Sequence, residues 1–155
     1  MPEFEPSSDA LTERAADLKL NAVRRHIFLC ADQTKPSCCT REAGVEAWNY
    51  LKRRLGELGL LDRVYRTRAN CLRICESGPI ALIYPEGVWY RNANPEALER
   101  IVQEHLIGGR IVEELAFAHS PVCESCEEFT LPPLLAEDRT NPAAPDSAQT
   151  ASKPA

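Results

Sequence analysis

The sequence predicts an α/β domain in which a small mixed four-stranded sheet is covered by two helices. Short apolar runs of strand length alternate with two longer amphipathic stretches, in the order β-α-β-β-β-α, which suits such a sheet. A polar segment, partly helical, precedes this pattern over residues 1–22, and the domain itself spans 23–119. Six of the twelve prolines lie beyond residue 120, so we expect 120–155 to be an acidic, proline-rich and largely disordered tail.

The first elements follow from hydrophobic spacing. Residues 9–20 favour a short helix because Leu11, Ala15 and Leu18 share one face. The run HIFLC at 26–30 is short, apolar and bounded by polar residues, which is typical of a buried strand.

A longer helix follows a loop. Thr40 is a suitable N-cap, and Gly59 is a suitable residue just beyond the C-terminal end. The apolar stripe between them recurs at spacings of three and four and comprises Val45, Trp48, Leu51, Leu55 and Leu58.

The second half of the domain predicts three strands and a helix. The strands are expected at 63–67, 79–85 and 88–91, the last two joined in a hairpin by the turn sequence YPEG. Asn94 and Pro95 are typical of a helix start. The buried face of this helix comprises Leu98, Ile101, Val102, His105 and Leu106, and residues 110–118 are expected to pack back on the domain.

Charge is distributed unevenly along the chain. The formal net charge is −5, but residues 1–20 carry −3 and residues 121–155 carry −4, which leaves +2 for residues 21–120. The basic residues form no nucleic-acid-type run, and few aromatic side chains are present for base stacking, so nucleic acid is not an expected partner. A polar, acidic start and the lack of any long apolar run favour a cytoplasmic protein without membrane insertion.

Seven cysteines are more than a core of this size needs. Cys30 ends the first strand, Cys38 and Cys39 lie in the loop that follows, and Cys71 and Cys75 precede the third strand. If the first and third strands are antiparallel neighbours, both cysteine loops meet at one edge of the sheet. Thiols in the cytosol stay reduced, and several thiolates at one point repel one another unless a cation lies between them. The pattern therefore predicts a metal centre.

The cysteine spacing bears on which metal is bound. Structural zinc usually takes paired C-x2-C knuckles, whereas here the spacings are C-x7-C or C-x8-C and C-x3-C. The longer first loop suits a wider object such as a [2Fe–2S] cluster, but the plant-type C-x4-C-x2-C spacing is absent.

The chain resembles the thioredoxin-like [2Fe–2S] ferredoxins over roughly residues 25–118. The motifs that carry the resemblance are HIFLC, CCTREAG, NCLRICESGP, YPEGVWY and EHLIGG. The resemblance implies a thioredoxin-like fold, a single [2Fe–2S] cluster, one-electron transfer and often a homodimer. It assigns Cys30, Cys39, Cys71 and Cys75 as ligands. Cys39 is preferred to Cys38 because it keeps the family's distance to Gly44.

We therefore expect an electron carrier rather than an enzyme. One alternative keeps the cluster but places the chain as an electron-transfer subunit of a larger oxidoreductase, of the NADH dehydrogenase, hydrogenase or formate dehydrogenase type. A third interpretation is a zinc-bound interaction module. Cys123 and Cys126 form a C-x-x-C pair in the acidic tail, and we interpret them as an exposed pair outside the main site. The alternatives are half of a zinc site completed across a dimer and a redox-sensing pair.

Basic residues gather around the two cysteine loops. Lys35, Arg41, Arg68 and Arg73 stand in or beside them, against Asp32 and Glu76. Two interpretations are open: the bases only offset the negative charge of a thiolate-bound cluster, or they form a docking face for redox partners that carry an acidic patch. Pro79 precedes the third strand, and the sequence leaves the isomer of the Gly78–Pro79 bond open.

Overall fold

The computed structural model describes residues 8–122. Its sheet has the spatial order β2-β1-β3-β4-β5, in which β1 and β2 are parallel and the other neighbours are antiparallel. The strands are β1 (Arg25–Cys30), β2 (Val64–Ala69), β3 (Ala81–Tyr84), β4 (Val88–Tyr90) and β5 (Ala116–His119). The mixed sheet and the antiparallel pairing of β1 with β3 confirm the sequence prediction. The expectations for the tail, with Cys123 and Cys126, fall on residues outside the described range.

The fifth strand is an addition to the four that the sequence predicts. β5 pairs antiparallel with β4, and the ladder has an irregularity between Trp89 and Tyr90. The strand is the four-residue segment AFAH, in which no residue is fully buried. A short edge strand with two alanines gives little hydrophobic alternation, so its sequence indicates only that the segment packs back on the domain.

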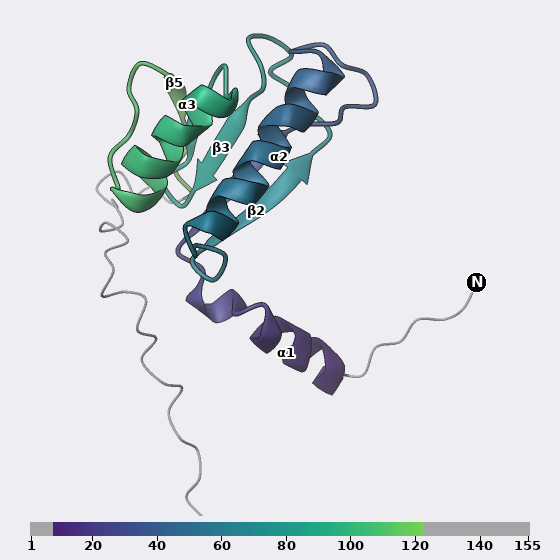
Figure 1. Cartoon of the computed structure of the whole chain (residues 1–155), viewed down its shortest axis with the longest axis vertical. Helices are drawn as coiled ribbons and strands as arrows, with labels where there is room; N and C mark the ends of the chain where they lie inside the picture. Colours follow the sequence, from purple (N-terminus) through teal and green to yellow (C-terminus); the bar gives the residue numbers. More distant parts are fainter. Residues whose placement is uncertain (1–7, 123–155) are drawn as a thin grey trace, which may run out of the picture.

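Helix α2 (Arg41–Glu57) and helix α3 (Pro95–Arg100) lie over one face of the sheet (Figure 1). α3 continues as π-helical turns, η2 (Ile101–Ile107). Both predicted caps are present, because Thr40 Oγ1 accepts the Ala43 N–H at 3.2 Å and Asn94 Oδ1 accepts the Ala97 N–H at 2.9 Å. Each satisfies a backbone donor that the helix leaves unpaired.

The core lies between the helices and the inner face of the sheet. Alternate residues of each strand point toward the helices, such as Ile27 and Leu29 of β1, and the intervening residues point to the opposite face. That opposite face, covered by neither α2 nor α3, carries an aromatic layer in which the His26 and Phe28 rings stack 4.1 Å apart and Phe28 meets Tyr84 edge-on. The predicted inner residues of α3 and η2 are all buried.

The core also contains two buried polar pairs, Tyr90 with His105 and Arg25 with Glu86. The Tyr90 hydroxyl lies 2.8 Å from His105 Nδ1, as expected for a hydrogen-bonded core histidine, and it accepts the Val112 N–H at 3.2 Å. Arg25 forms an ion pair with Glu86 at 2.8 Å, and both side chains are almost fully buried. Pairing offsets the cost of removing these groups from water.

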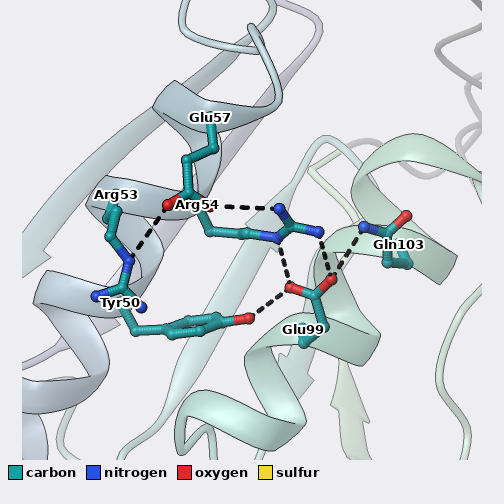
Figure 2. A network of polar contacts seen from close by, with 6 residues as sticks. All are labelled: Tyr50, Arg53, Arg54, Glu57, Glu99 and Gln103. Atoms are coloured by element: carbon teal, nitrogen blue, oxygen red, sulfur yellow. Dashed lines mark hydrogen bonds and ion pairs between the residues drawn. The ribbon is translucent and has the colours of Figure 1, made fainter.

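A polar network ties α2 to α3 (Figure 2). Arg54 donates from Nε and Nη2 to the two carboxylate oxygens of Glu99, both at 2.9 Å, and the Tyr50 hydroxyl donates to the same carboxylate. Gln103 donates to Glu99 at 3.0 Å. Arg54 thus turns toward α3, whereas the preceding Lys52 and Arg53 are exposed.

The N-terminal extension forms helix α1 (Ser8–Asp17), followed by a 3-10 turn, η1 (Leu20–Ala22). This confirms a helical extension with a start one residue earlier than expected. Its apolar residues Leu11 and Leu18 are 57% and 44% exposed, so α1 does not contribute to the domain core.

Candidate metal centre

Two loops bring four cysteines to the same edge of the sheet. Cys30 ends β1, Cys38 lies in the loop from β1 to α2, and Cys71 and Cys75 lie in the loop from β2 to β3. β3 is antiparallel to β1, so its start lies beside the end of β1. The four cysteines share a small hollow whose other lining residues are Gln33, Lys35, Ser37, Leu72, Arg73, Ile74 and Ile80.

The sulfur atoms are arranged as two pairs. Cys30 Sγ and Cys38 Sγ are 3.8 Å apart, and Cys71 Sγ and Cys75 Sγ are 4.0 Å apart. Two thiolates bound to one tetrahedral metal at about 2.3 Å lie roughly 3.8 Å apart. Each pair therefore has the separation that suits one metal ion. Among residues 8–122, no group of three or more His, Cys, Asp or Glu side chains could hold a single ion.

Cys39 lies beside this hollow and does not line it. Its Sγ is 3.9 Å from Cys38 Sγ and 3.4 Å from Gln33 Nε2. The structure thus brings together Cys30, Cys71 and Cys75 with Cys38, and places the sequence-preferred Cys39 next to them.

Cys38 is packed against the second cysteine loop at Gly78. The Gly78 N–H donates to the Cys38 carbonyl at 3.0 Å, and a Cβ added at Gly78 would lie 2.5 Å from Cys38 Sγ. A glycine is required at this close approach, because any side chain would collide with the sulfur. The Gly78–Pro79 bond, left open by the sequence, is cis.

The second loop has an unusual backbone. Arg73, Cys75 and Ser77, at alternate positions, have φ of 65°, 55° and 50°, in the left-handed region that non-glycine residues rarely adopt. Such backbone conformations turn successive N–H groups to one side and form concavities that bind anions. The Arg73 N–H donates to Cys71 Sγ at 3.2 Å. This backbone shape therefore supplies a hydrogen-bond donor to one sulfur of the hollow.

Three of the four thiols that line the hollow have raised pKa values. Burial raises the pKa of Cys30 and Cys38, and the hydrogen bond with Cys71 raises the pKa of Cys75. Metal ligation requires thiolates, so cation binding must displace these protons. Cys30 is buried whereas Cys71 and Cys75 are exposed, so one sulfur pair lies deeper than the other.

The basic residues around the loops fall into two groups. Arg41 and Arg68 both form ion pairs with Asp32, the latter at 3.1 Å. Lys35 and Arg73 instead line the hollow with the cysteines.

A larger groove of about 1090 Å³ runs along α2 and is lined by residues of both charges, among them Arg41, Glu46 and Trp48. It contains no thiol, so it lacks the ligands of an iron–sulfur cluster.

Comparison with known proteins decides the family. The chain is 36% identical over 95 residues to a putative 2Fe-2S ferredoxin of Priestia megaterium, covering 61% of this chain and 71% of that protein. It is 30% identical over 99 residues to a 2Fe-2S ferredoxin of Aquifex aeolicus, covering 61% and 89% respectively. The solved structure of a thioredoxin-like [2Fe–2S] ferredoxin from Aquifex aeolicus superimposes with a TM-score of 0.57 at 29% identity, over 66% of this chain and 99% of that one. The chain belongs to the thioredoxin-like [2Fe–2S] ferredoxins. No protein-family model matches it.

The ferredoxin assignment confirms the expected fold, the [2Fe–2S] cofactor and the role of electron carrier. The donor set fits the cofactor, because [2Fe–2S] clusters are held by four cysteine thiolates and the hollow presents four in two pairs. Within the described part of this ferredoxin, no helix is long and apolar enough to cross a membrane.

Two features of the site were missed by sequence reasoning. The first is Gln33, whose amide nitrogen lies 3.4 Å from Cys30 Sγ. The only sequence signal for it is its position between two cysteines. The left-handed residues of the second loop are not glycines, so no residue type signals that backbone shape.

Proposed function

We propose that this ferredoxin holds its cluster through Cys30, Cys38, Cys71 and Cys75. Cys30 and Cys38 would bind one iron, and Cys71 and Cys75 the other. The observation that carries this is that these four thiols line one hollow, in sulfur pairs 3.8 and 4.0 Å apart. Cys39 Sγ is 3.9 Å from Cys38 Sγ but does not line the hollow. The geometry favours Cys38 over Cys39, the reverse of the preference drawn from the distance to Gly44.

When bound, the cluster would supply a one-electron couple between its oxidised and reduced states. The chain's residues would hold it between the buried Cys30 with the partly exposed Cys38 on one side and the exposed Cys71 and Cys75 on the other. Because Cys71 and Cys75 are the exposed ligands, the second loop gives the shortest path for an electron to enter or leave.

Single cysteine-to-serine variants test the ligand set. Cys38→Ser should lose or shift the visible absorption of the cluster and lower the iron content, and Cys30→Ser, Cys71→Ser and Cys75→Ser should do the same. Cys39→Ser is the matched control, since it alters the neighbouring thiol in the same loop, and it should keep the native spectrum. An intact spectrum in Cys38→Ser with a bleached Cys39→Ser would restore the sequence-based assignment.

We propose further that redox partners dock on the cysteine loops through an acidic patch. Lys35 and Arg73 line the hollow, whereas Arg41 and Arg68 share one carboxylate, so the first two are the stronger candidates. Replacing Lys35 and Arg73 with glutamine should slow association with the electron donor or acceptor and flatten its salt dependence. Replacing Lys52 and Arg53, exposed on α2, is the control. Equal association rates in both variants would contradict the docking site.

We also propose a homodimer in which the uncovered face of the sheet meets a second copy. Its aromatic layer leaves Phe28 and Trp89 half-buried and in reach of a partner, and aromatic side chains are enriched in such interfaces. Light scattering over a dilution series should give the mass of two chains. A single-chain mass at all concentrations would exclude the dimer.

The remaining assignments belong to the same proposal. The domain would span residues 23–119, act in the cytoplasm and serve as a free carrier, in keeping with relatives that are named ferredoxins. Size-exclusion of native extract tests this, because a subunit of an oxidoreductase would elute with a large complex.

A further inference from the structure

Gln33 stands at the centre of the first cysteine loop. Its side chain is 3% exposed, and its Nε2 lies 3.4 Å from Cys30 Sγ, 3.5 Å from Cys38 Sγ and 3.4 Å from Cys39 Sγ. An amide nitrogen carries two hydrogens, so at most two of these sulfurs can receive a strong hydrogen bond at a time.

The orientation of the amide is set by the sulfurs. Gln33 Oε1 is buried and has no hydrogen-bond partner within residues 8–122. It points toward α2, where a Cβ at Gly44 would lie 3.2 Å from it. Rotating the amide by 180° would aim the oxygen lone pairs at the thiolates, which also carry negative charge. A buried unpaired acceptor is costly, so the donors must make a strong interaction in return.

The loop that carries Gln33 is fixed to the second cysteine loop. The Thr34 N–H donates to Asn70 Oδ1 at 2.9 Å, and Asn70 Nδ2 donates to Thr34 Oγ1 at 2.9 Å. These bonds join the residue after Gln33 to the residue before Cys71. The amide is therefore held in place before any negative charge is added at the sulfurs.

We propose that Gln33 is the side-chain hydrogen-bond donor that sets the reduction potential of the cluster. Reduction adds one electron and so increases the negative charge on the thiolates. Bonds from N–H groups to those sulfurs strengthen as the charge grows, and they stabilise the reduced form more than the oxidised form. Gln33 thus raises the potential as a positioning residue, without ligating iron.

The proposal rests on the assignment of Cys30 and Cys38 as ligands. It does not fall with the choice of Cys38, because Gln33 Nε2 is also 3.4 Å from Cys39 Sγ. Failure of the ligand set appears as a lost spectrum in the serine variants, whereas failure of the Gln33 proposal appears as an unchanged potential with the spectrum intact.

The first test replaces the donor by an apolar side chain of similar size. In Gln33→Leu, the reduction potential of the cluster should fall. At a fixed applied potential, the ratio of reduced to oxidised protein should drop roughly tenfold, because the variant loses about one charge-assisted hydrogen bond. The matched control is Gln103→Leu on η2, where the same change affects an exposed glutamine hydrogen-bonded to Glu99. It should leave the ratio unchanged. A native potential in Gln33→Leu with full iron content overturns the proposal.

The second test uses the native chain, so that it does not depend on the folding of the variant. The reduced cluster is paramagnetic, and pulsed electron paramagnetic resonance on protein labelled with ¹⁵N in glutamine side chains should detect one strongly coupled amide nitrogen. The same coupling should persist in Gln103→Leu. No glutamine side-chain coupling in the native protein would show that the amide does not touch the cluster sulfurs, and would overturn the proposal.

Discussion

Gly78→Ala tests whether the contact between the two cysteine loops holds a ligand in place. The added Cβ would lie 2.5 Å from Cys38 Sγ, 2.9 Å from its Cβ and 3.2 Å from its carbonyl carbon. Nonbonded heavy atoms normally lie about 3.5–4.0 Å apart, so the sulfur must move by roughly 1 Å. Metal–ligand distances tolerate only about 0.2 Å, so the displaced sulfur cannot keep its place in the centre.

The same collision should affect folding. Overpacking of this kind typically costs about 1–3 kcal/mol, and part of it falls on the backbone of Cys38, which cannot rotate away as a flexible side chain would. We therefore expect Gly78→Ala to show reduced iron content, a weakened visible spectrum and a lower denaturation midpoint.

Gly56→Ala is the matched control, because a Cβ at Gly56 meets no atom within 4 Å. Gly56 lies near the end of α2, where alanine should stabilise the helix by about 0.5–1 kcal/mol. Iron content and denaturant midpoint should be measured for both variants. A native spectrum and stability in Gly78→Ala would refute the reasoning, since the loops would then not need their close approach.

Three further predictions concern the scaffold. The hydrogen bonds from Arg54 hold the pKa of Glu99 at about 2, so the stability that this ion pair contributes is complete above pH 4.5 and is lost as the pH falls toward 2. Because the pair is partly exposed, Glu99→Gln should lower the free energy of unfolding by only about 1 kcal/mol at pH 7 and should make stability depend less on pH in that range. An unchanged dependence of stability on pH between 4.5 and 2 would contradict this. Tyr90→Phe deletes the hydroxyl that is hydrogen-bonded to His105 and should lower the free energy of unfolding, measured by urea denaturation, by about 1–3 kcal/mol. An unchanged free energy of unfolding would show that this bond does not stabilise the fold. Thr40→Ala should cost about 1 kcal/mol, with Thr40→Ser retaining the cap as control.

Much of the fold could be predicted because its elements carry strong periodic signals. The apolar stripe of α2 and the N-cap at Asn94 depend only on residues close together in the chain, so they can be recognised in a single sequence. β5 carries no such signal, since its place depends on the free edge of β4, which is a tertiary property. Arg54 shows the same limit, because its partner Glu99 lies 45 positions away in the sequence.

The sequence predicts which loops form the site, but not how the individual side chains lie within them. Strand order brought the two cysteine loops to one edge, which the antiparallel pairing of β1 and β3 confirms. The choice between adjacent thiols depends on which of them turns toward Gly78, and sequence spacing does not encode that direction. Gln33 was missed because an amide near thiols has no fixed spacing.

Asp32 sets the charge of the surface beside the cysteine loops. With φ of 56°, it turns the chain after β1 and places its carboxylate between Arg41 at the start of α2 and Arg68 at the end of β2. One carboxylate thus offsets part of the charge of two guanidinium groups that both remain exposed. Loss of this carboxylate would make the surface beside the hollow more positive without changing any of the four sulfurs, so the proposed docking surface and the proposed ligand set can be altered separately.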